Sequence, residues 1–200
     1  MRSLSEASAL ASLRVDLVRE ALKDYGPDVQ RAVDELESLV NVDAAAQRGR
    51  IEKLLPLMAS GDVRRGHAVY YSAKAACSAC HRLGNAGGEI GPELTHIGER
   101  RTERDLLESI LYPNLSIVQS YESVLVITTD GRTIVGKIRD ESPDELVIVT
   151  GADQETRIAP ADVETIEPST VSIMPAGLDA QLTTEQLADL VAFLKNAKGG

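Results

Sequence analysis

The spacing of apolar residues predicts helices at both ends of the chain and short strands between them. Over roughly the first 60 residues, apolar side chains recur every three or four positions, as on a helix with one buried face. We expect a helix over residues 4–23, a second along the apolar stripe 29–40, and a third over 45–58. Gly26-Pro27-Asp28 is the expected break between the first two, with Asp28 as a cap.

Three polar residues mark the starts of further helices. Asp62 is expected to cap a helix over residues 63–72, and Thr102 one that runs to about residue 112. Thr183 or Thr184 is expected to cap the last helix, whose apolar stripe packs inward.

The hydrophobic period changes to that of strands between residues 120 and 167. Asp130-Gly131 between two alternating segments is a strong hairpin signal. Five short strands are expected, over residues 121–129, 132–139, 146–150, 156–158 and 163–166. They predict a small antiparallel barrel or curled sheet.

Charge limits the classes of partner. The chain of 200 residues has a net charge of −10, which argues against nucleic-acid binding because phosphate neutralisation needs clustered Lys and Arg. Residues 117–168 hold 11 Asp and Glu against 4 Lys and Arg. This acidic segment is either a solvated surface or a docking face for a basic redox partner.

No part of the sequence has the features of a membrane span or a leader. No stretch approaches the ~20 apolar residues that span a bilayer, and the first residues lack the basic region and apolar run of a signal peptide.

The strongest chemical signal is Cys77-Ser78-Ala79-Cys80-His81, which contains the only two cysteines. C-x-x-C-H is the attachment signature of a c-type haem. One helical turn separates the sulfurs, so both can form thioethers with the vinyl groups on one porphyrin edge, and the following imidazole can bind the iron.

Three other uses of these residues stay open at this point. A thioredoxin-like dithiol would need a βαβ context, which is absent around Cys77. A zinc site could draw on Cys77, Cys80, His81 and His96. A disulfide between the two cysteines is the third.

The flanking sequence resembles class I cytochromes c. The segment from Gly61 to Tyr70 is similar to their G-D-x-x-x-G-x-x-x-aromatic helix, and Gly91-Pro92-Glu93-Leu94 to their G-P-x-L. Ala192-Phe193-Leu194 resembles the family's last helix, against which Gly66 would pack closely. The closest similarity, from Gly61 to Asn196, is to the haem-binding domain of planctomycetes and verrucomicrobia.

This resemblance implies a set of haem-binding residues. Cys77 and Cys80 would carry the thioethers of one covalent haem c, and His81 would be the proximal iron ligand. The carbonyl of Pro92 would accept a hydrogen bond from His81 and orient its ring. Met174, on a loop before the last helix, would be the second axial ligand.

Two further residues are assigned by their place in the family pattern. Arg100 is expected to contact a haem propionate through a charge-assisted pair. His96 is expected near the haem edge, and it is the alternative distal ligand to Met174.

The resemblance also implies a fold. We expect a mainly α, class I cytochrome c-like domain over residues 61–200, interrupted by the β-rich insert at about 117–168. Residues 1–60 would be a separate helical segment, compatible with the end of a helical-repeat region.

The implied function is electron transfer by a single-haem module that is not itself an enzyme. Its partner would be a redox protein or a fused dehydrogenase domain, and the chain would be part of a larger periplasmic or otherwise exported protein. The alternatives are a haem-based gas or redox sensor with a displaceable methionine, and a haem-free interaction module.

Overall fold

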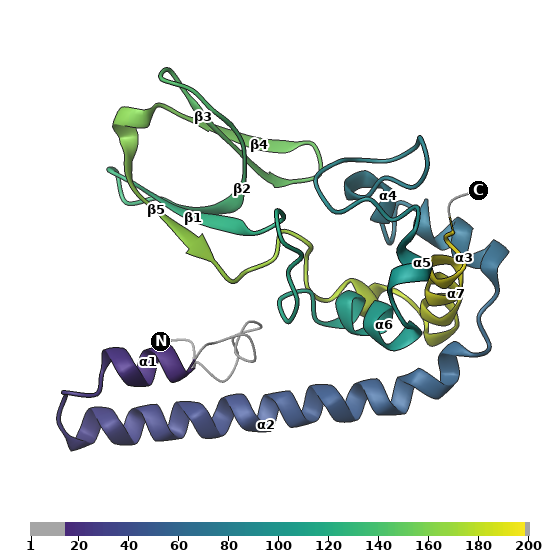
Figure 1. Ribbon diagram of the computed structural model, residues 1–200, viewed down its shortest axis with the longest axis horizontal. Helices are drawn as coiled ribbons and strands as arrows, with labels where there is room; N and C mark the ends of the chain where they lie inside the picture. Colours follow the sequence, from purple (N-terminus) through teal and green to yellow (C-terminus); the bar gives the residue numbers. More distant parts are fainter. Residues whose placement is uncertain (1–14, 199–200) are drawn as a thin grey trace. The chain divides into compact units, whose positions relative to one another are not determined.

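The computed structural model describes residues 15–198, which fall into two compact units that divide between Lys53 and Leu54. The first unit contains α1 (Val15–Ala21) and most of α2 (Pro27–Met58), which is drawn in purple and blue in Figure 1. Arg19 of α1 donates to Asp34 and Glu37 of α2 over 2.7 and 2.6 Å. The first part of the predicted helix 4–23 lies outside the described residues.

The two helices expected over residues 29–40 and 45–58 are one continuous helix of 32 residues. No Gly or Pro interrupts the sequence between them, so the hydrogen-bond ladder continues. Asp28 is not the cap: Pro27 begins the helix, which suits its fixed φ, and the carbonyl of Gly26 accepts from the amides of Val29 and Gln30.

The described part of the second unit contains the end of α2 and five further α-helices. These five are α3 (Val63–Tyr70), α4 (Cys77–Cys80), α5 (Ile97–Arg100), α6 (Glu103–Leu111) and α7 (Thr184–Lys195). The expected caps are confirmed at Asp62, Thr102 and Thr183, each of which accepts from the amide three residues later. At Thr102 and Thr183 the third residue also bonds back, which completes a capping box.

The close pairing of α3 with α7 forms the core of the helical part (Figure 1). Gly66 lies directly against the Asp189 carbonyl and Phe193, where any side chain would collide. The expected close approach of Gly66 to the last helix is therefore confirmed. Buried residues of α6 and α7, among them Leu107, Leu190 and Val191, continue this core.

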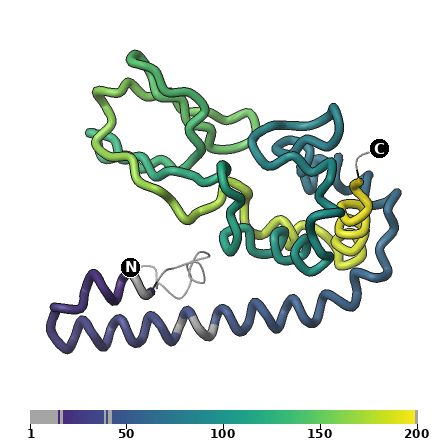
Figure 2. Tube along the Cα trace, viewed as in Figure 1, coloured from purple at the N-terminus to yellow at the C-terminus, as the bar shows by residue number. Residues whose placement is uncertain are grey.

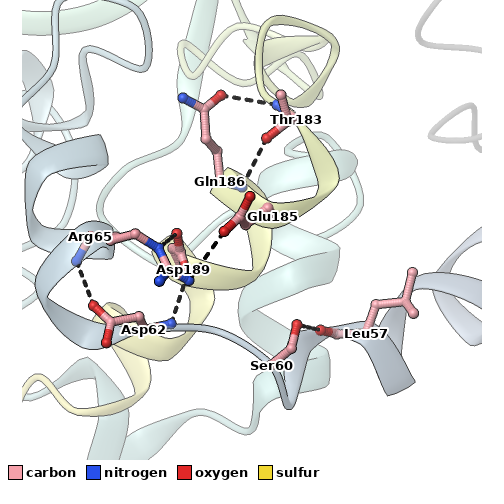
Figure 3. A network of polar contacts seen from close by, with 8 residues as sticks. All are labelled: Leu57, Ser60, Asp62, Arg65, Thr183, Glu185, Gln186 and Asp189. Carbon is pink, nitrogen blue, oxygen red and sulfur yellow. Dashed lines mark hydrogen bonds and ion pairs between the residues drawn. The ribbon is translucent and has the colours of Figure 1, made fainter.

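A buried carboxylate ties the two helices together (Figure 3). Asp189 of α7 is 2% exposed, and it accepts from the amide of Asp62 at 2.7 Å. It also accepts two bonds from the Arg65 guanidinium, at 2.7 and 2.8 Å. The charge is thus fully compensated although it is buried.

The remaining chain forms one antiparallel sheet, in green in Figures 1 and 2. Its strands are β1 (Ser123–Thr128), β2 (Thr133–Glu141), β3 (Leu146–Gly151), β4 (Gln154–Ile158) and β5 (Val163–Ser169). Their order is β4-β3-β2-β1-β5, so β5 returns to pair with β1. Five strands were expected, and the Asp130-Gly131 turn joins β1 to β2 as predicted.

The sheet has a core of its own, which overturns the expected fold class. Val126, Leu146, Ile148 and Ile158 form a buried cluster on it. Helices account for 44% of the chain and strands for 20%. The expectation of a mainly α, class I cytochrome c-like fold is therefore wrong, and the chain is a mixed α and β protein. The helix caps at Asp62, Thr102 and Thr183 were recognised correctly, but the contribution of the sheet to the fold was underestimated.

Within residues 15–198, none of the helices combines the length and the apolarity that crossing a membrane requires.

Candidate functional site

The two cysteines lie on the single helical turn α4. Ala76 precedes this turn with left-handed backbone (φ 50°), and His81 follows it in extended conformation (φ −111°, ψ 130°). Both cysteines are half-buried free thiols, so they do not form the disulfide that the sequence left open. Burial raises the pKa of Cys77 to about 11, and burial followed by the charge of Asp153 raises the pKa of Cys80. Both thiols are therefore protonated at neutral pH.

His81 is held with one ring nitrogen engaged and the other free. Its Nδ1 lies 2.8 Å from the carbonyl oxygen of Pro92. A carbonyl only accepts, so Nδ1 carries the proton and Nε2 presents its lone pair. No residue in the described range bonds to Nε2. Burial is the main reason why the pKa of His81 is lowered, and this keeps the ring neutral and able to bind a metal.

The loop after His81 folds back onto the cysteine turn through main-chain hydrogen bonds. Gly88 donates to the carbonyl of Ser78 at 2.9 Å, and Gly91 to that of Cys80 at 2.8 Å. Gly91 also lies flat against the imidazole: a Cβ there would be 2.5 Å from Cε1 of His81. The G-P pair thus has two functions, because the glycine makes room for the ring and the proline carbonyl orients it.

The turn between β3 and β4 lies beside Cys80, which the sequence analysis did not anticipate. The negative charge of the Asp153 carboxylate raises the pKa of the Cys80 thiol, and a hydrogen bond with the backbone of Ala152 lowers it. Asp153 adopts left-handed backbone (φ 53°), as Asp does more readily than most residues in tight turns. No local pattern signals this contact, because it joins segments about 70 residues apart.

Met174 lies half-buried on the loop between β5 and the short helix η4 (Leu178–Gln181). Its amide donates to the Ser172 hydroxyl at 3.2 Å, and the Ser172 amide donates to the side chain of Asn114 at 2.8 Å. The Ser123 hydroxyl bonds to the carbonyl of Val171. These contacts tether the methionine loop to the start of the sheet and to the chain that follows α6.

His96 directly precedes the short helix α5, and Arg100 is the last residue of that helix. Arg100 is exposed, and its guanidinium has no partner in the described part of the chain. His96 is half-exposed, with Nδ1 3.6 Å from a carboxylate oxygen of Glu99. The ammonium of Lys195 on α7 donates to the carbonyls of Gly98 and Arg101, which fastens α5 to α7.

The structure therefore gathers Cys77, Cys80, His81 and Pro92 into one site. It does not assemble a zinc site from the two cysteines, His81 and His96: across residues 15–198, no three His, Cys, Asp or Glu side chains group closely enough to hold a metal ion.

The gathered residues fit a covalently bound haem. Two unpaired thiols one turn apart suit two thioether bonds, and the adjacent Nε2 is a free, neutral ligand. Gly91 lies against the imidazole, and the Pro92 carbonyl orients the ring through Nδ1.

No protein-family model matches the chain, and no curated protein matches it either. Function is therefore inferred from the residues of the site.

Proposed function

We propose that this chain is a single-haem c-type cytochrome module that transfers electrons and is not itself an enzyme. The observation that carries the proposal is the arrangement of His81, which directly follows two free thiols on one helical turn. Its Nδ1 donates to the Pro92 carbonyl, and its Nε2 bonds to no residue between 15 and 198. When bound, haem supplies a one-electron iron couple.

The chain's own residues would attach the group and tune it. Cys77 and Cys80 would each add their S–H across a vinyl group, a step that needs no external oxidant. His81 would bind iron through Nε2, and the Pro92 bond would make this ligand more basic. Met174 would supply the second protein ligand of the iron through its thioether sulfur. A thioether favours ferrous iron, so this ligand raises the reduction potential relative to a second histidine.

Charge supports two further parts of the proposal. Arg100, exposed and without a partner in the described range, is the candidate for a haem propionate, and His96 lies four residues before it. The acidic sheet would attract a basic redox partner or a basic face of a fused dehydrogenase domain, since complementary charge raises association rates. The enclosing protein would be periplasmic or otherwise exported, where thioether attachment takes place.

The decisive experiment is expression together with a cytochrome c maturation system. We expect a haem stain that persists on a denaturing gel, and oxidised and reduced optical spectra of low-spin haem. Replacing both Cys77 and Cys80 with Ala should abolish the stain. Ser78→Ala, which changes the same turn but keeps both thiols, is the matched control and should retain it. An unstained wild-type chain would refute the proposal in favour of a haem-free interaction module.

Carbon monoxide separates electron transfer from sensing. A tightly six-coordinate ferrous protein should keep its spectrum when the gas is added. A rapid spectral shift would mean that Met174 is displaceable and would favour a gas or redox sensor.

A further inference from the structure

Tyr70 connects the α3–α7 core to His81. It is the last residue of α3, and it is fully buried, with 0% of its surface exposed. Its hydroxyl donates to the main-chain carbonyl of His81 at 2.7 Å. A buried phenol needs such a partner, but the partner here is the residue that carries the proposed iron ligand.

This bond completes a three-point attachment of His81. The His81 amide donates to the main-chain carbonyl of Cys77 at 2.9 Å, and its ring Nδ1 donates to the carbonyl of Pro92 at 2.8 Å. The His81 carbonyl accepts from the Tyr70 hydroxyl. Gly87 lies closely against the same carbonyl. The peptide plane that follows His81 is thereby fixed, and with it the direction in which the imidazole leaves the backbone.

Tyr70 is itself held rigidly. Its ring packs against Phe193 of α7 with centroids 5.5 Å apart, and edge-on against Tyr71 at 4.9 Å. Because Phe193 belongs to the helix that also carries Asp189, the position of the Tyr70 hydroxyl depends on the packing of α3 against α7.

We propose that Tyr70 is a positioning residue for His81, which sets the geometry of the Nδ1–Pro92 hydrogen bond through the His81 carbonyl. The effect on the reduction potential of a bound haem rests on the proposed function, whereas the effect on the orientation of the His81 ring does not. Without the hydroxyl, the carbonyl is free to turn toward water, the Nδ1–H bond lengthens, and Nε2 becomes a weaker electron donor.

The first test uses the full chain without haem. Nitrogen NMR of the His81 imidazole reports which ring nitrogen carries the proton. We expect Tyr70→Phe to raise the Nε2–H tautomer population at least about twofold, because the bond that favours Nδ1–H is loosened. Tyr71→Phe removes the same atom from the adjacent ring, whose hydroxyl bonds to no described residue, and should leave the populations unchanged. Equal populations in wild type and Tyr70→Phe would overturn the proposal.

A measurement on the wild-type chain covers the case in which Tyr70→Phe does not fold. A hydroxyl bonded at 2.7 Å inside the core should exchange its proton with water far more slowly than the Tyr71 hydroxyl. Exchange at the rate of the Tyr71 hydroxyl would show that the bond is absent and would refute the role.

The second test uses the matured protein. At a fixed ambient potential, Tyr70→Phe should raise the ratio of ferrous to ferric protein about threefold, because a less basic His81 stabilises ferric iron less. The haem stain should be retained, and Tyr71→Phe should behave as wild type. An unchanged ratio would contradict the proposal. Failure of wild type to attach haem would instead refute the proposed function, and the imidazole test would still decide the role of Tyr70.

Discussion

At the scale of single residues, the site depends on Gly91 having no side chain. The imidazole of His81 occupies the space in which a Cβ would lie, so ring and main chain are in direct contact. An added methyl group at Gly91 would overlap the ring, so either the imidazole or the main chain would have to move.

Gly91→Ala should therefore push the His81 ring away from Pro92. We expect a loss of about 1–3 kcal/mol in the free energy of unfolding, measured by urea denaturation, together with a changed spectrum of the matured protein. Gly49→Ala is the control: Gly49 lies in α2 with open space around its Cα, so alanine there should keep or raise stability. A Gly91→Ala protein as stable as wild type would show that the contact is not restrictive.

Met174 gives a second prediction at this scale. Met174→Ala should keep the covalent haem, because both thioethers remain, but should lose the absorption band that marks sulfur–iron ligation. Ile173→Ala changes the neighbouring half-buried side chain without removing sulfur, and should keep the band. If the band survives in Met174→Ala, another sulfur binds the iron and Met174 is not the axial ligand. Absence of the band from the wild-type protein would instead make His96 the candidate.

At the scale of elements, Asp189 joins α3 to α7. The Arg65 hydrogen bonds, and then the Asp62 amide, lower the pKa of this carboxyl despite its burial. A group whose pKa is lower in the folded state stabilises the fold above its unfolded pKa of about 3.9. This contribution is lost as pH falls through the folded value.

Asp189→Asn should consequently cost about 2 kcal/mol of unfolding free energy at pH 7, allowing for the half-exposed Arg65. The difference from wild type should shrink below about pH 4, as the wild-type carboxyl takes up its proton. Glu185→Gln removes the exposed partner of Arg65 and should change stability little at any pH. A pH-independent deficit in Asp189→Asn would mean that packing, not charge, is responsible.

The β3–β4 turn gives a prediction for the insert. The carboxylate of Asp153 lies near enough to Cys80 to interact with its thiol electrostatically. Its negative charge should therefore stabilise ferric iron, which carries one more positive charge than ferrous iron. Asp153→Asn should raise the ferrous-to-ferric ratio about twofold at fixed ambient potential, measured by redox titration of the matured protein. Asp144→Asn, on the turn at the other end of β3, also removes an exposed negative charge and should have a smaller effect. Equal shifts in both variants would indicate only a general charge effect.

At the scale of the whole molecule, local signals in the sequence predict the elements well. The caps at Asp62, Thr102 and Thr183 were recognisable because a cap is a contact within four residues. The Asp130-Gly131 hairpin was recognisable for the same reason. The continuity of α2 was missed, since weak periodicity near its middle was interpreted as a gap between helices.

Contacts between segments distant in the chain could be predicted from the sequence only in part. The Pro92–His81 bond was inferred from a family resemblance, and the structure places the two groups in hydrogen-bonding distance. The Tyr70 hydroxyl bond and the approach of Ala152 to Cys80 were not inferred, because no pattern of spacing encodes them. The prediction of the fold class was wrong for a related reason. The lengths of the strands can be estimated from the sequence, but the formation of a separate hydrophobic core on the sheet depends on tertiary packing.

The pairing of α3 with α7 has a consequence for the order of events during synthesis. Asp62 and Asp189 are 127 residues apart, so the helix that leads into the cysteine turn is made long before the helix that holds it. Until α7 emerges, Tyr70 lacks its packing partner Phe193, and Arg65 of α3 lacks the carboxylate of Asp189. Long-range closure of this kind is slow relative to local helix formation. The His81 carbonyl, to which Tyr70 donates, would thus be fixed only late in synthesis, when the last helix docks.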